Sequence, residues 1–212
     1  MPKDCFSLRK IELKLLANNS TGRIQMNDTS PTLAQNYLDA SIADFKRIKR
    51  LAEKAFEQLH DEDYRWTPDG ESNSIAVLIK HLGGNMVSRW TDFLATDGEN
   101  PDRARDGEFV DDVDTRKQLM EIWERGWSRL FGTLESLGEE ELLQTIHIRG
   151  EAHSVVEAIS RQLWHYSLHV GQILYIAKHR RGTHWKSLSI PRGQSEEYVR
   201  SRRGRRDLLR KQ

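Results

Sequence analysis

Four segments of this chain carry apolar residues at the spacing of an amphipathic α-helix, and this pattern constrains the fold more than any other feature. The segments are residues 33–59, 74–95, 114–137 and 154–178. Proline, glycine and clustered acidic residues separate them, as is typical of turns and loops. Four long helices with one long connection in the middle predict an all-α protein built as a four-helix bundle.

Two local signals refine this prediction. Pro31 lies between Ser30 and Thr32, and proline is tolerated in the first turn of a helix, so either neighbour can cap the first helix. Residues 142–149 alternate weakly between apolar and polar and end at Gly150. We therefore expect a short strand, or one arm of a hairpin, directly before the last helix.

The 212 residues divide by these signals into three parts. We expect an N-terminal extension without stable structure at residues 1–28, one helical domain at residues 29–190 and a basic tail at residues 191–212. Met26 lies just ahead of the first helix signal, so the first 25 residues could be an upstream extension rather than part of the native protein.

The charge is unevenly distributed along the chain. Residues 178–212 hold 12 Lys/Arg and 3 Asp/Glu, a net +9, so the overall +1 leaves −8 for residues 1–177. The basic tail has Tyr198 as its one aromatic residue and contains no motif that reads a groove of nucleic acid. We expect the tail to be solvated and not to bind nucleic acid; the alternative is contact with nucleic acid or another anionic partner.

Several protein classes are excluded or disfavoured by composition. The single cysteine, Cys5, excludes an internal disulfide framework and a zinc site made of cysteines. No apolar run approaches the roughly 18 residues of a membrane span, and the N-terminus lacks the apolar core of a secretory signal. The expectation is a cytoplasmic protein with no membrane contact.

The chemistry of the chain is concentrated in histidine. His165 and His169 are four residues apart on the least polar segment, so they share one face of a helix, and Arg161 and Gln172 lie on the same stripe. Such a polar line on an apolar helix costs free energy unless it faces a polar pocket. Glycine-rich phosphate loops, G-x-S-x-G and H-E-x-x-H motifs are absent.

The second helical segment has a matching polar stripe that includes His81 and Asn85. If the two stripes converge inside a bundle, three imidazoles plus water form the open coordination set of a catalytic divalent metal. The alternative is that these histidines are satisfied core residues or lie at the surface. Gly83 and Gly84, beside His81, are most simply explained by a close approach of two helices.

Three further residues have two readings each. Asn85 and Gln172 could orient water or substrate, or could hydrogen-bond to the imidazoles from behind. Arg161 could pair with an anionic substrate or with a buried acid such as Asp92 or Glu157. The metal is not specified by three histidines, which suit zinc, nickel, iron or manganese to different degrees.

Three stretches of the chain resemble the DinB/YfiT-like superfamily of metal-binding four-helix proteins, in an uncharacterised bacterial branch. They are KHLGGNMVSRWTDFLATDGENPDRARDGEF, IRGEAHSVVEAISRQLWHYSLHVGQILYIAKH and SLSIPRGQSEEY, and the resemblance covers residues 30–199. It implies an up-down-down-up bundle, usually a homodimer. It also implies a divalent metal, often nickel or zinc, held by His81, His165 and His169.

The resemblance also implies a function. Characterised relatives include transferases and isomerases that use low-molecular-weight thiols such as bacillithiol or mycothiol. We therefore expect a metal-dependent enzyme that transfers a thiol sulfur to a small electrophile. The alternatives are a metal-dependent hydrolase and a stress-related binding protein without catalysis.

Overall fold

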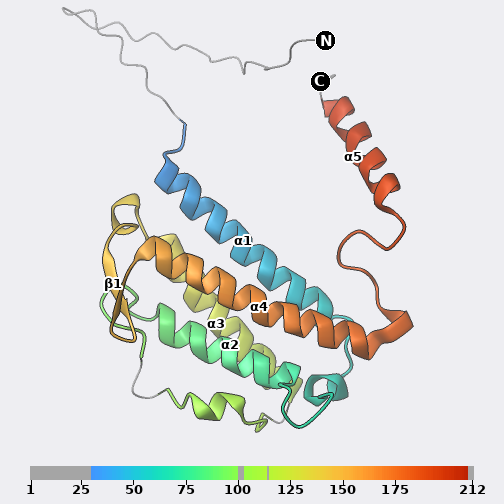
Figure 1. The fold of residues 1–212 in the computed structure, drawn as a ribbon, viewed down its shortest axis with the longest axis horizontal. Helices are drawn as coiled ribbons and strands as arrows, with labels where there is room; N and C mark the ends of the chain where they lie inside the picture. Colours follow the sequence, from blue (N-terminus) through green and yellow to red (C-terminus); the bar gives the residue numbers. More distant parts are fainter. Residues whose placement is uncertain (1–29, 100–102, 114, 210–212) are drawn as a thin grey trace, which may run out of the picture. The chain divides into compact units, whose positions relative to one another are not determined.

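The computed structural model describes residues 30–99, 103–113 and 115–209; the predicted N-terminal extension, residues 1–28, lies outside them. All described helices belong to one compact unit, residues 31–212. The longer helices are α1 (Leu33–Phe56), α2 (Ile75–Trp90), α3 (Arg116–Ser136), α4 (Val155–Arg181) and α5 (Ser195–Leu209) (Figure 1). The prediction of a mostly helical protein is confirmed, and no described helix has the length and apolar character needed to cross a bilayer.

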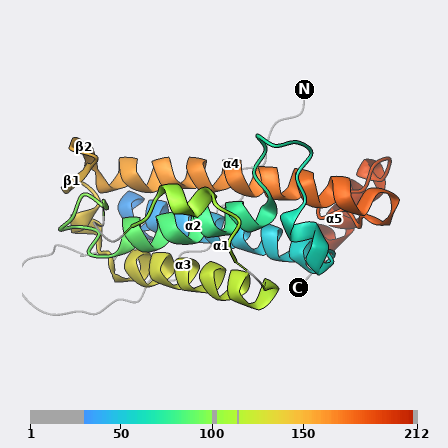
Figure 2. The same cartoon turned by 90° about the horizontal axis from the view of Figure 1, so that it is seen from below.

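Helices α1 to α4 pack side by side around one hydrophobic core, α1 along α4 and α2 along α3 (Figure 2). Each of these four helices contributes one large aromatic side chain to the centre of that core. The ring of Phe45 lies 5.9–6.4 Å, centroid to centroid, from the rings of Trp90, Trp127 and Tyr166. Because aromatic contacts of this kind depend on ring orientation, they restrict how each helix can rotate about its axis.

Each of these four helices begins after a serine or threonine whose hydroxyl accepts a hydrogen bond from a backbone N–H in the first turn. The capping residues are Thr32, Ser74, Thr115 and Ser154. Such caps satisfy donors that the helix itself leaves unpaired. The predicted first residues of these four helices agree with the structure to within two residues.

Helix α2 ends earlier than predicted, at Trp90 rather than near residue 95. Thr91 is already extended, and Asp92 has a φ of +47°, which interrupts the helix even though Phe93 and Leu94 continue its apolar pattern. The connection that follows runs back along α2 and contains the short 3₁₀ helix η2 (Asp106–Phe109).

A two-stranded antiparallel hairpin precedes α4, as the alternating pattern predicted. Strands β1 (Thr145–Ile148) and β2 (Glu151–Ser154) are joined by the two residues Arg149 and Gly150, whose φ angles are +54° and +78°. Two consecutive positive φ angles match the twist of the strands, and glycine accepts such an angle without strain. The hairpin leads directly into the capping residue of α4.

Glycine permits the close packing of α2 on α3. A Cβ atom at Gly126 of α3 would lie 2.9 Å from the Cα atom of Gly83, and one at Gly83 would lie 2.9 Å from the carbonyl oxygen of Ile122. Both distances are too short for a real side chain. The close approach of two helices that we expected at Gly83 and Gly84 is therefore present, and Gly83 is the residue of the pair that allows it.

A buried carboxylate joins the far end of α4 to the short 3₁₀ helix η1 (Asp61–Arg65). Asp63, 3% exposed, accepts hydrogen bonds from the Nε of Arg180 at 2.7 Å and from the backbone N–H of His60 at 2.9 Å. Burial alone would raise the pKa of Asp63, but these hydrogen bonds and the charge of Arg180 outweigh it and hold the pKa below its usual 3.8.

Asp63→Asn should therefore lower the free energy of unfolding by about 1–3 kcal/mol at pH 7. A lowered pKa stabilises the fold above the unfolded value and ceases to do so as the carboxylate is protonated, so the difference should shrink as the pH falls below about 4. Urea unfolding at both pH values measures this. Asp44→Asn, at an exposed ion pair, is the control and should change little; a difference that grows in acid would contradict the account.

Candidate metal centre

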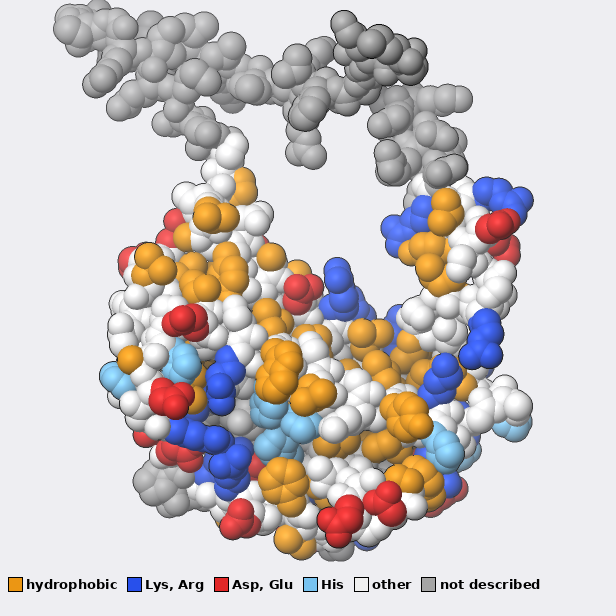
Figure 3. All heavy atoms as spheres, viewed as in Figure 1, with side chains coloured by type: hydrophobic (Ala, Val, Ile, Leu, Met, Phe, Trp, Pro, Cys, Tyr) orange, Lys and Arg blue, Asp and Glu red, His pale blue; other side chains and the backbone are white. Residues whose placement is uncertain are grey.

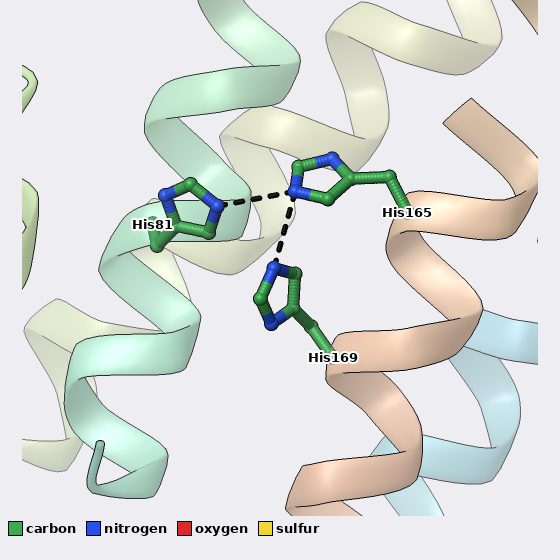
Figure 4. A group of neighbouring side chains, drawn as sticks. All are labelled: His81, His165 and His169. Atoms are coloured by element: carbon green, nitrogen blue, oxygen red, sulfur yellow. Dashed lines mark hydrogen bonds between the residues drawn. The ribbon is translucent and has the colours of Figure 1, made fainter. Parts of the chain in front are cut away.

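Helices α2 and α4 bring three imidazole rings together (Figure 4). His81 comes from α2, and His165 and His169 lie one turn apart on α4. The Nε2 atom of His165 lies 3.2 Å from that of His81 and 3.1 Å from that of His169. One ring nitrogen from each residue lies within 4.8 Å of the other two, so the two polar stripes seen in the sequence meet.

The opposite ring nitrogens contact oxygen acceptors. The Nδ1 atom of His81 lies 3.1 Å from a carboxylate oxygen of Glu108, and the Nδ1 atom of His169 lies 2.8 Å from the amide oxygen of Gln172. An ionised carboxylate and an amide oxygen can only accept, so in each pair the proton belongs on Nδ1. The Nε2 lone pairs of His81 and His169 are then free, and both face the Nε2 atom of His165.

This donor set fits a divalent metal ion. Zinc–nitrogen bonds of about 2.0–2.1 Å in a tetrahedral site place two nitrogens about 3.3–3.4 Å apart, close to the Nε2 separations of His165 from its two neighbours. Lone pairs that face each other at this range repel unless a cation or proton lies between them. Two of the three nitrogen separations are therefore consistent with a metal-binding set.

The pKa values of His165 and His169 are both lowered, which favours the neutral form of their imidazoles. Burial is the largest cause that lowers the pKa of His165 to about 3, and the charges of His169, His81 and Arg161 contribute to the same shift. Burial also lowers the pKa of His169, although its hydrogen bond to Gln172 opposes the change. A neutral imidazole can bind a metal without first losing a proton.

Glu108 is a residue of the site that the sequence did not single out. It is buried, and the Nε and Nη2 atoms of Arg103 donate to its two oxygens at 2.7 and 2.9 Å. Burial would raise the pKa of Glu108, but the hydrogen bonds from His81 and Arg103 outweigh it and lower the pKa. The carboxylate is thus charged and orients His81, a role typical of groups behind metal ligands.

Gly84 makes room for this carboxylate. A Cβ atom at Gly84 would overlap the carboxylate of Glu108, which lies directly over the helix backbone at that position. The two adjacent glycines therefore have different roles. Gly83 allows α3 to approach, and Gly84 allows Glu108 to reach His81.

The other predicted residues lie near the cluster but differ in their contacts. Gln172 hydrogen-bonds to His169, as in the second of its two readings. The amide oxygen of Asn85 instead accepts a hydrogen bond from the buried hydroxyl of Tyr166 at 3.0 Å. Arg161 lines the pocket described next and forms no ion pair with Asp92 or Glu157.

A pocket of about 310 Å³ adjoins the three histidines. Its walls come from α2, the connection after α2, the hairpin and α4. The centroid of the Phe109 ring lies 4.9 Å from the centroid of the His81 ring. Trp164, 67% exposed, lines the pocket from α4. A larger surface depression of about 770 Å³ between α2 and α3 contains none of the three histidines, so the chemistry favours the smaller pocket.

A family model described as "Protein of unknown function (DUF1572)" matches residues 32–194. The chain belongs to this family. The match includes α1 to α4, the hairpin and all three histidines. The searches of curated proteins and of solved structures returned no match. The DUF1572 description assigns no activity, so the function has to be argued from the site.

Gly84→Ala tests the packing of the site. Alanine normally stabilises a helix by about 0.5–1 kcal/mol relative to glycine. At Gly84 it should instead destabilise, because Glu108 must leave Arg103 and His81 to make room. Gly171→Ala is the matched control on α4, where a Cβ atom has nothing within 4 Å, and it should raise the melting temperature. Equal stabilisation by both substitutions would show that Glu108 does not occupy this position.

Proposed function

We propose that this DUF1572 protein is a divalent-metal-dependent enzyme that acts on a small molecule, with His81, His165 and His169 as the metal ligands. One observation carries the proposal. Three Nε2 atoms converge at the wall of a pocket, and oxygen acceptors on Nδ1 hold two of the rings in the tautomer that leaves Nε2 free. Zinc or nickel suits this set best, with iron or manganese as alternatives.

The chain's own residues supply orientation and enclosure. Glu108 and Gln172 fix the rings of His81 and His169, so the ligands need little rearrangement. Phe109 covers one side of His81 with an apolar ring. A divalent ion held by three neutral imidazoles has open positions at which it lowers the pKa of a thiol or a water molecule.

We further propose that the reaction is the transfer of a low-molecular-weight thiol to a small electrophile. This step rests on the resemblance to the DinB/YfiT-like superfamily, in which such transferases occur. An up-down-down-up order of α1 to α4 belongs to the same proposal. The long connection between α2 and α3 and the hairpin between α3 and α4 support it.

A homodimer is part of this proposal as well. Three large apolar residues of α4 are exposed on one stripe of the helix, at 67% for Trp164, 47% for Leu168 and 76% for Tyr175. A stripe of this kind is typical of a surface that a partner covers.

The experiment is a conjugation assay on the full chain loaded with zinc or with nickel. Mixed with cysteine, bacillithiol or mycothiol and a chromogenic chloronitrobenzene, it should form the thioether at a rate that requires both metal and protein. His165→Ala with His169→Ala should abolish this rate. The control, His147→Ala with His184→Ala, removes two exposed histidines and should retain it.

The alternatives give different results in the same assay. Turnover of an activated ester without any thiol would identify a hydrolase. Absence of turnover with every thiol and metal, together with stoichiometric metal binding, would leave a non-catalytic binding protein and would reject the proposed transfer reaction.

A further inference from the structure

Arginine side chains gather around the pocket beside the three histidines. Five of them line it, from α2, the connection after α2, the hairpin and α4: Arg89, Arg103, Arg105, Arg149 and Arg161. One carboxylate, Glu99, lines the same pocket, and Glu108 lies behind Arg103, so cations exceed anions by three. Lys and Arg side chains are visible beside the histidines in Figure 3. Residues 1–177 carry a net −8, so this positive charge is local.

Three of the five arginines are engaged by the protein itself. Arg103 donates to both oxygens of Glu108, and the Nε of Arg149 lies 3.1 Å from a carboxylate oxygen of Glu99. Arg89 is buried and donates to a backbone carbonyl oxygen in the connection that follows α2. These contacts stabilise the walls of the pocket and use up much of their hydrogen-bonding capacity.

The other two arginines are available to a ligand. Arg105, from the connection, and Arg161, one turn before His165 on α4, are both exposed. Neither guanidinium group forms a hydrogen bond or an ion pair with any residue that the structure describes. A guanidinium group presents parallel N–H donors that match a carboxylate or a phosphate group.

We infer that this pocket binds a small molecule bearing a carboxylate or phosphate group, held by Arg105 and Arg161 next to the three histidines. The volume equals the liquid share of about ten water molecules, which suits a metabolite rather than a polymer. The inference deepens the proposed function and rests on it for the reaction, because the anionic group would anchor the substrate or thiol beside the metal ligands.

The test uses the metal-free full chain, so that a metal cannot bind the probes. Succinate and, separately, inorganic phosphate are titrated while the indole N–H signal of Trp164, assigned with Trp164→Phe, is followed by NMR. We expect the chemical shift of this indole N–H signal to change saturably with at least one probe. The probe that causes the change shows whether the pocket prefers a carboxylate or a phosphate group. Arg105→Gln with Arg161→Gln should weaken binding about tenfold or more.

The matched control removes two exposed arginines from α1, Arg47→Gln with Arg50→Gln, and should change the affinity by less than about twofold. No saturable shift with either probe, or equal weakening by both arginine pairs, would overturn the inference. The variant His165→Ala with His169→Ala should still bind the probe, which separates the two proposals. A chain that binds metal but no anion would retain the proposed function and lose this inference.

Discussion

The hydroxyl group of Tyr166 links the packing of the helices to the geometry of the histidine cluster. It accepts a hydrogen bond from the indole N–H of Trp90 and donates one to the amide oxygen of Asn85, and it is fully buried. A buried hydroxyl without partners would cost about 1–3 kcal/mol, so these bonds select one rotation of α4 against α2. In that rotation, His165 and His169 face His81.

The charges of the site are arranged in two layers. Glu108 is directed inward, where the guanidinium group of Arg103 neutralises its charge and the ring of His81 hydrogen-bonds to it. It therefore orients His81 without adding unpaired negative charge to the adjacent pocket. Arg105 and Arg161 lie on the outer layer, where solvent and a small molecule can reach them. The result is a positive pocket inside an otherwise acidic body.

Periodicity predicted the elements well because most helices here bury one face. The caps at Thr32 and Ser154 and the hairpin before α4 agree with their local signals. The early end of α2 was not predictable from pattern, since it depends on the backbone angle of Asp92. Helix α5 was also missed, because the basic tail has no apolar period that marks a helix.

The same division applies to the site. The spacing of His165 and His169 and the polar stripe of His81 indicated which histidines could converge, because helical geometry fixes the face on which each one lies. That the two faces meet depends on the packing of α4 against α2. Glu108 and Arg105 could not be found this way, because they come from a charged connection without period, and their positions depend on how it folds back on α2. Gly84, close to His81 in the sequence, was a weaker signal of the contact between Glu108 and His81. Only the structure shows that the absence of a side chain at Gly84 makes room for Glu108.

The most direct test of the account is the metal content of the full chain purified without nickel affinity resin or chelator, and then after exposure to zinc, nickel, iron or manganese. We predict close to one metal ion per chain, and none in a folded variant carrying His165→Ala and His169→Ala. A parent protein that is isolated without metal and takes up none of the four would contradict the account, and the histidines would then be polar residues of the core.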